Sequence, residues 1–267
     1  MLALVEDVGK ATLNIFDYVG NLTLQLWAGL RALGAALPLA GNRHRWSASV
    51  AQMLRIGVDA MPMVGLMAIC AGFILAMQGA SELRRFGAIR YVIDLVAVGF
   101  TRELGPLLTA IAVSGRSGSA FSAEIGTMMV TEEVDALRIM AFDPIEFVLG
   151  PKFLAALVMI PCLSILANVC GILSGWIFMF FSTHLGFVVY LKYALESIKI
   201  HDLIGGLIKS LAFATIIVQV GCLEGFRVRG GPEAVGRSTT AAVVKSTFLV
   251  IVADLIFTAI FYATGVS

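Results

Sequence analysis

The sequence is poor in charge, with only 14% Asp, Glu, Lys and Arg in a chain that is 59% apolar. Soluble domains carry about 25% charged and about 45–50% apolar residues. So few charges cannot cover a surface that faces water, which indicates an integral membrane protein. The formal net charge of +1 supplies no concentrated basic face, so no nucleic-acid partner is expected.

Motifs for catalysis, nucleotide binding and redox chemistry are missing as well. The cysteines form no C-x-x-C pair, the histidines are scattered, and we interpret the cysteines as small core residues. The chain has no G-x-x-x-x-G-K-[ST], G-x-S-x-G or H-E-x-x-H motif. We therefore expect a non-catalytic chain without metal or cofactor, and energy for any work on a substrate must come from another protein.

The N-terminal segment is predicted to lie along the membrane surface. Glu6 and Asp7 stand where a cleavable signal peptide would carry positive charge, so no such signal is expected. Residues 11–37 are apolar at helical spacing and broken by polar side chains, which favours an interfacial helix. A helix of a soluble core is the alternative, although little soluble domain exists for it to join. Residues 41–46 are basic with one tryptophan, as expected at the level of the lipid headgroups.

The apolar runs predict an all-α integral membrane protein with five transmembrane helices after the interfacial helix. An apolar run of about 20 residues crosses the hydrocarbon core. The predicted spans are residues 61–80, 91–114, 149–181, 203–223 and 247–264. Small residues at four-residue spacing, such as Gly72 with Ala76 and Gly171 with Gly175, favour close helix contacts. The alternative is that glycine is simply common in membrane helices.

Lys and Arg predict the orientation. With the N-terminus in the cytoplasm, twelve of these residues lie on the inner side and five on the outer side, as positive-inside topology requires. The C-terminus is then periplasmic. Residues 182–202 form a short outer excursion.

Charged residues inside the spans are candidates for function, because such residues are unfavourable in lipid. Arg102 and Glu103 are adjacent in the second span and point about 100° apart, so they need not pair with each other. Asp202 and Lys209 share one face of the fourth span, and Asp254 lies in the fifth. An ion pair that only stabilises the bundle is the alternative for Arg102 and Glu103.

The connection between the second and third spans is predicted to bind a partner. The chain would leave the membrane through S-G-R-S-G-S-A at 114–120 and form an acidic amphipathic helix that ends at Asp143-Pro144. Thr131 is the predicted N-cap, with Glu132 and Glu133 in the first turn and Arg138 near the end. Such a helix suits a groove on another protein. A loop resting on headgroups is disfavoured, because anionic lipids would repel its acidic residues.

Several motifs together resemble the MlaE/YrbE permease family. They are R-E-L-G-P at 102–106, S-G-R-S-G-S-A at 114–120, A-E-I-G-T-M at 123–128, E-E-V-D-A-L at 132–137, A-F-D-P at 141–144, D-L-I-G-G-L-I-K-S at 202–210 and G-R-S-T-T at 236–240. The resemblance covers about residues 54–267. It suggests an N-terminal interfacial region, 1–50, and a permease membrane domain, 51–267.

The resemblance implies a function and a set of partners. Members of this family are membrane subunits of ATP-binding-cassette (ABC) systems that move phospholipids between the inner membrane and an Mce-domain protein, which maintains outer-membrane lipid asymmetry. The implied assembly is a homodimer with an ABC ATPase (MlaF-like) that holds ATP and Mg, an Mce-domain protein (MlaD-like) and, as a further candidate, a STAS-domain protein (MlaB-like). The implied location is the bacterial inner membrane.

The resemblance also implies roles for particular residues. The lipid cavity would be lined by Glu103 with Arg102, Leu104 and Gln78. The coupling helix on the ATPase, residues 123–137, would present Glu124, Ile125, Met128, Glu132, Glu133, Asp135 and Leu137. Polar or gating positions within the membrane domain would be Asp202, Lys209, Arg237 and Asp254.

Two other functions remain open. A self-sufficient secondary transporter or channel would usually show internal repeats, and five spans do not divide into equal halves. A membrane-embedded lipid enzyme would need convergent acid–base or metal-binding residues, whereas the sequence shows only isolated charges.

Overall fold

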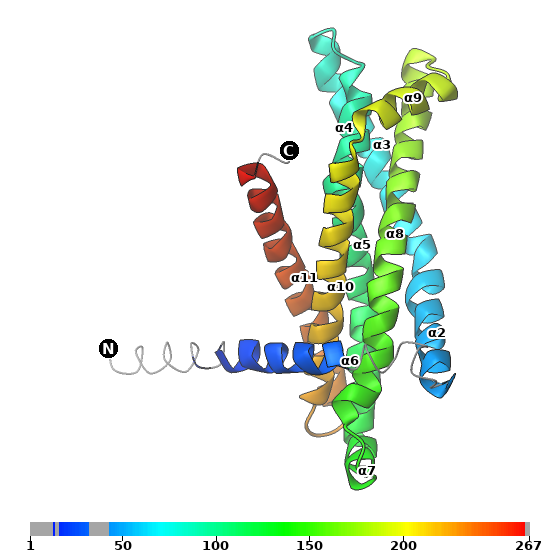
Figure 1. Ribbon diagram of the computed structural model, residues 1–267. Helices are drawn as coiled ribbons and strands as arrows, with labels where there is room; N and C mark the ends of the chain where they lie inside the picture. Colours follow the sequence, from blue (N-terminus) through cyan, green and yellow to red (C-terminus); the bar gives the residue numbers. More distant parts are fainter. Residues whose placement is uncertain (1–12, 14–15, 32–42, 265–267) are drawn as a thin grey trace.

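The computed structural model describes residue 13, residues 16–31 and residues 43–264, and this part of the chain is helical without strands (Figure 1). Five helical stretches are long and apolar enough to cross a membrane: Trp46–Arg85, Tyr91–Val130, Pro144–Thr183, Ile200–Phe226 and Pro232–Ala263. The predicted fold class and number of spans are therefore confirmed. Each span is longer than predicted.

A helix over residues 16–31 lies across the bundle, near the end that carries α7 (Figure 1). The buried Gln25 faces the bundle, where its Nε2 donates a hydrogen bond to the carbonyl oxygen of Gln219 over 3.3 Å. Phe16, Leu24 and Trp27 are exposed, as expected of a helix that rests on lipid. The rest of the predicted helix, residues 11–12, 14–15 and 32–37, lies outside the described residues.

The first span is a continuous helical stretch of α2 (Arg43–Gly57), η2 (Val58–Ala60) and α3 (Met61–Arg85). Its predicted start at residue 61 was too late, because Arg55 and Asp59 interrupt the apolar run without interrupting the helix. Residues 43–46 belong to the start of α2, and the predicted domain boundary after residue 50 falls within that helix.

The second span contains two π-helical turns. It runs through α4 (Tyr91–Gly99), the π turn η3 (Phe100–Leu104), α5 (Gly105–Val113), the π turn η4 (Ser114–Gly118) and α6 (Ser119–Val130). The segment 114–120, through which the chain is predicted to leave the membrane, remains helical; Ser114 and Ser117 are buried, and Ser119 is half-buried. Ser114 Oγ lies 2.6 Å from Ser246 Oγ on α11, and Ser122 Oγ lies 2.7 Å from Ser238 Oγ.

A short helix, α7 (Glu133–Ile139), forms the tip of the bundle after a break at Glu132, whose φ is 60°. Glu132 occupies the N-cap position in place of the predicted Thr131. The Thr131 hydroxyl instead donates back to the carbonyl of Thr127 over 3.0 Å. The next helix, α8 (Pro144–Thr183), is capped by Asp143, whose carboxylate accepts from the Ile145 amide over 2.9 Å.

The remaining helices are α9 (Phe187–Ser197), α10 (Ile200–Phe226) and α11 (Pro232–Ala263). The short α9 lies at the end of the bundle opposite α7, and α11 leans away from the other helices toward its C-terminal end (Figure 1). The predicted contact between small residues is present, since a side chain on Gly72 of α3 would collide with the Gly171 carbonyl of α8.

Candidate functional site

A broad pocket of about 900 Å³ lies between α3 and α4, on the half of the bundle that carries α9. We call it the α3–α4 pocket. Apolar side chains such as Leu75, Leu95 and Val98 make up most of its wall. Polar groups are few and include Gln78, Arg102, Glu103 and Thr258. Apolar walls with a few placed polar groups are typical of a site for an amphipathic ligand.

A buried lysine organises the charges behind this pocket. The Lys209 side chain is fully buried, and its ammonium donates to a carboxylate oxygen of Glu103, to Asp254 Oδ1 over 2.9 Å and to Thr258 Oγ1 over 2.9 Å. Those three bonds use all the donors of the ammonium group. We call Glu103, Lys209, Asp254 and Thr258 the Lys209 cluster. It joins the second, fourth and fifth spans.

Arg102 is held more loosely. Its guanidinium lies 3.8 Å from a Glu103 carboxylate oxygen and 4.0 Å from Asp202 Oδ1, beyond hydrogen-bond distance in both cases. Asp202 is itself engaged by the backbone amide of Lys199 over 3.1 Å. Among the described residues, Arg102 therefore retains donors without a hydrogen bond beside the α3–α4 pocket, whereas Glu103 is bound by Lys209.

The π turn η3 places Arg102 and Glu103 at this site, and neighbouring helices fix it closely. A side chain on Gly206 of α10 would collide with the Thr101 carbonyl, and one on Gly171 of α8 would collide with the Phe100 ring. The Asn168 amide, oriented with its nitrogen toward the turn, donates to the Phe100 carbonyl over 2.9 Å. A π turn is a common device at functional sites, because it changes which side chains face the neighbouring helices.

Three of the four predicted cavity residues line the α3–α4 pocket, and one does not. Gln78, Arg102 and Glu103 line the α3–α4 pocket, whereas Leu104 is half-buried against the core and does not. Among the predicted polar positions, Lys209 and Asp254 join the Lys209 cluster and Asp202 lies beside Arg102. Arg237 stands apart, because its side chain is 76% exposed near the start of α11 and pairs with Glu233 at 3.8 Å.

Among the polar residues of this site, sequence reasoning missed Glu82, Asp94 and Thr258. Thr258 binds Lys209, and Asp94 lines the pocket while accepting a hydrogen bond from Ser197 of α9. Asp94 carried a usable signal, since it is a carboxylate in an apolar run. Thr258 carried none, because a threonine within a span usually bonds to its own helix, as this one also does through the Asp254 carbonyl at 2.8 Å.

The predicted coupling residues fall into two groups. Ile125 is fully buried, Met128 packs against the core, and Glu124 pairs with the buried Lys152 at 2.9 Å, so these three belong to the bundle. Glu132, Glu133 and Asp135 are exposed at α7, where the half-buried Leu137 packs toward the core. Three exposed apolar residues lie beside these acids, which are Ile139, Met140 and Phe142.

The N-terminal helix meets the bundle through a set of polar contacts. Lys245 pairs with Glu224 at 2.9 Å, Arg227 lies 3.6 Å from Asp17, and both cations lie over the Tyr18 ring at 4.9 Å. Burial, reinforced by the negative charge of Glu224, raises the pKa of Tyr18 above its ordinary value. The phenol therefore stays neutral, and the contact holds across the physiological pH range.

Five apolar spans, a pocket that reaches a buried charge cluster and a short acidic helix between two spans define a membrane-embedded transport subunit. Residues 49–260 match the family described as Permease MlaE. The chain therefore belongs to the MlaE family of ABC transporter permeases.

Similarity to individual proteins extends over nearly the whole chain. The chain is 32% identical to a "Probable ABC transporter permease protein" of Rickettsia felis, and the match covers 98% of this chain and 99% of the relative. It is 31% identical to the "Intermembrane phospholipid transport system permease protein MlaE" of Haemophilus influenzae, covering 98% of both chains. It is also 31% identical to the chloroplastic protein TRIGALACTOSYLDIACYLGLYCEROL 1 of Arabidopsis thaliana, covering 89% of this chain and 69% of the relative.

Proposed function

We propose that this chain is the permease subunit of an ABC transporter that moves phospholipids between the bacterial inner membrane and an Mce-domain partner, and so maintains outer-membrane lipid asymmetry. The observation that carries the proposal is the α3–α4 pocket of about 900 Å³, which combines apolar walls with the free donors of Arg102. The Haemophilus influenzae relative is named for phospholipid transport, which supports the same substrate class.

The pocket suggests how a phospholipid is held. Acyl chains lie against Leu75, Leu95 and Val98, and the phosphate accepts hydrogen bonds from Arg102, because a guanidinium matches phosphate geometry. Glu103 acts through Lys209 by fixing the helices around the pocket rather than by binding the headgroup. This assigns different tasks to the two adjacent charges.

The energy comes from a partner ATPase that holds ATP and Mg, which makes the permease itself non-catalytic. The exposed acids of α7, together with Ile139, Met140 and Phe142, form the surface that docks on this ATPase. Two permease copies and two ATPases form the transporter, with an Mce-domain protein at the α9 end and a STAS-domain protein as a further partner. Rigid-body movement of α7 then reaches the pocket through the packed helices.

Transfer of a fluorescent phospholipid from vesicles that contain the reconstituted complex tests the role of Arg102. Arg102→Gln should lower the rate by about ten- to a hundredfold, the range expected when a hydrogen bond to a charged group is lost. The control is Arg237→Gln near the start of α11, where the arginine is 76% exposed and lies outside the pocket lining. Equal transfer by Arg102→Gln and the parent would refute headgroup binding by Arg102.

Co-purification of the ATPase tests the docking surface. Ile139→Asp combined with Met140→Asp should abolish recovery of the ATPase and ATP-dependent lipid transfer, because two charges would enter an apolar contact. Val188→Asp, at an exposed apolar residue of α9 at the opposite end of the bundle, is the matched control and should retain ATPase recovery. Normal ATPase recovery with the α7 pair would show that the partner docks elsewhere.

A further inference from the structure

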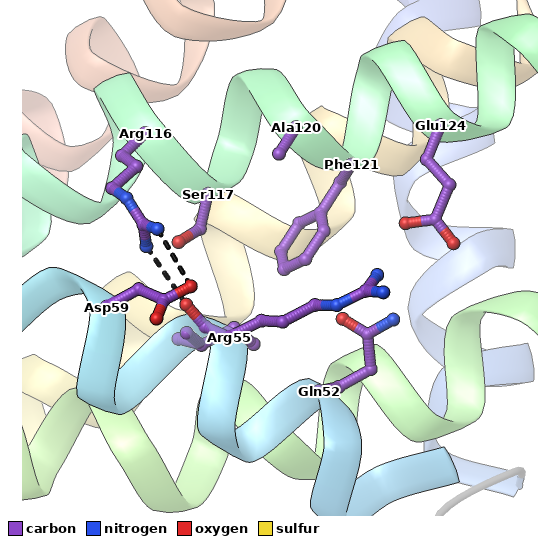
Figure 2. Close-up of a pocket in the computed structure, with 9 residues that line it drawn as sticks. Gln52, Arg55, Asp59, Arg116, Ser117, Ala120, Phe121 and Glu124 are labelled. Carbon is purple, nitrogen blue, oxygen red and sulfur yellow. Dashed lines mark hydrogen bonds and ion pairs between the residues drawn. The ribbon is translucent and has the colours of Figure 1, made fainter.

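A second, smaller pocket of about 230 Å³ lies between α2 and the junction of η4 with α6 (Figure 2). We call it the α2–α6 pocket. Gln52, Arg55 and Asp59 line it from the first span, and Arg116, Ser117 and Glu124 line it from the second. It shares no lining residue with the α3–α4 pocket. The proposed transport mechanism leaves it without a role.

The ion pairs of this pocket leave one cation free. Arg116 donates to the Arg55 carbonyl over 2.9 Å and to Asp59 Oδ2 over 3.0 Å, and Glu124 pairs with Lys152 at 2.9 Å. Within the part of the chain that the structure describes, the Arg55 guanidinium has no hydrogen bond or ion pair of its own. Figure 2 shows it extended toward the end of the pocket that holds Gln52 and Glu124. With Lys152 counted beside Glu124, the groups at the pocket carry three positive and two negative charges.

Ser117 provides an independent sign of a ligand. The side chain is only 4% exposed, and its hydroxyl lacks a hydrogen-bond partner among the described residues. In Figure 2 the hydroxyl points into the pocket, toward the side that holds Asp59 and Arg55. A buried hydroxyl without a partner is unfavourable, so an acceptor placed in the pocket would stabilise this arrangement. The π turn η4 directs Ser117 and Arg116 toward α2, as η3 directs Arg102 and Glu103 toward the other pocket.

The pocket lies at the depth of the interfacial helix. Lys152, which pairs with Glu124 at the pocket wall, lies on α8 between Leu149 and Phe153. Those two residues are the neighbours of Gly29 on the N-terminal helix. The phosphates of a bilayer lie at this interfacial level, and basic pockets between membrane helices are typical binding sites for lipid headgroups.

The outer face of α2 supplies a surface for acyl chains. Val50, Leu54 and Val58 are exposed at four-residue spacing and form a continuous apolar stripe beside Arg55. A lipid whose phosphate entered the pocket could lay its tails along this stripe toward the centre of the membrane. Free phosphate would gain nothing from the stripe.

We propose that the α2–α6 pocket binds the phosphate group of a phospholipid from the surrounding leaflet, with Arg55 as its cation and Ser117 Oγ and Gln52 Nε2 as further donors. Arg116 positions Arg55 by donating to its backbone carbonyl, and Asp59 holds the Arg116 guanidinium in place. The bound lipid bridges the first span to α6, and α6 leads into the break before α7. It is a resident lipid that braces the α7 end, distinct from the transported lipid.

Native mass spectrometry of the delipidated complex tests this assignment by titration with phosphatidylethanolamine, diacylglycerol or inorganic phosphate. The parent should bind phospholipid at one site per chain that is weakened in Arg55→Gln. The affinity of that site should be about tenfold or more lower in the variant. Ser117→Ala should lower the affinity of the same site by a smaller factor. This substitution changes the volume of the side chain little. Arg229→Gln is the matched control, because Arg229 is an exposed cation in the loop at the same end of the bundle.

The ligands distinguish the source of the phosphate. Phosphatidylethanolamine should bind at the Arg55-dependent site, and neither diacylglycerol nor millimolar inorganic phosphate should compete for it. Equal phospholipid binding by the parent, Arg55→Gln and Ser117→Ala would overturn the proposal. Displacement of the phospholipid by inorganic phosphate would overturn the assignment to a lipid. Unfolding temperatures of the variants that match the parent would establish that any loss of lipid is local.

Discussion

At the scale of single residues, neighbouring side chains with similar chemistry have different tasks. Arg102 and Glu103 are adjacent in η3, yet Glu103 is engaged by Lys209 whereas Arg102 keeps donors for a ligand. Arg116 and Arg55 differ in the same way, because the Arg116 guanidinium is paired whereas that of Arg55 has no partner in the described part of the chain. In each pocket, one charge fixes the helices and another is left available.

Lys209→Met should strongly destabilise the protein. The substitution removes the shared partner of Glu103 and Asp254 and leaves two carboxylates facing each other with little solvent, which costs about 3–5 kcal/mol. Thermal unfolding in nanodiscs would measure the loss. The triple variant Lys209→Met with Glu103→Gln and Asp254→Asn removes the charges together and should recover much of the stability. A single variant as stable as the parent would mean that the cluster is not a structural ion pair.

At the scale of helices, close approach of backbones determines where the charges lie. Gly206 of α10 sits directly on the Thr101 carbonyl of η3, so the fourth span presses against the π turn that carries Arg102 and Glu103. Gly72 and Gly171 allow the same proximity between α3 and α8. Tight packing of small residues, rather than apolar bulk, is what holds membrane helices together.

Gly206→Ala should destabilise the bundle by about 1–3 kcal/mol, because its methyl group would have to displace the η3 backbone. Gly236→Ala is the matched control, since a methyl group there meets nothing within 4 Å and alanine favours the helix. Denaturation in detergent compares the two. If Gly206→Ala were no less stable than Gly236→Ala, α10 would not be pressed against η3 as described.

At the scale of the whole molecule, the spans are longer than the membrane is thick. A helix of 40 residues, such as Pro144–Thr183, measures about 60 Å, whereas the hydrocarbon core is about 30 Å thick. The bundle must therefore project into water. The interfacial helix at residues 16–31 marks one membrane surface, so α7 and the adjoining ends of α6 and α8 stand beyond that surface.

Thiol labelling tests the predicted orientation, with α7 in the cytoplasm and α9 in the periplasm. In a variant without the native cysteines, Val188→Cys should react with an impermeant maleimide in cells whose inner membrane is intact. Met140→Cys should react only after that membrane is opened. Both residues are exposed, so access to the reagent decides the outcome. The reverse pattern would invert the predicted topology.

The number of spans could be predicted from the sequence, but the residues at which the spans begin and end could not. Apolar runs located five spans, but Arg55, Asp59 and Arg116 lie in helices that continue past them, and Asp59 and Arg116 pair with each other across two spans. The glycines and serines of segment 114–120 do not favour a helix, yet packing against α10 and α11 keeps this segment helical. Charges such as Lys209 and Asp254 stood out as functional, whereas their pairing across three spans depends on packing that no local pattern encodes.

The two π turns have a consequence for comparing members of the family. Each π turn holds one residue more than the α-helical turn it replaces, and one residue corresponds to a rotation of about 100°. A relative lacking one of these insertions would keep the same five spans and rotate everything downstream of the missing residue. Different side chains would then face the pockets. Single-residue gaps at 100–104 or 114–118 would therefore mark changes in lipid preference that percentage identity hides.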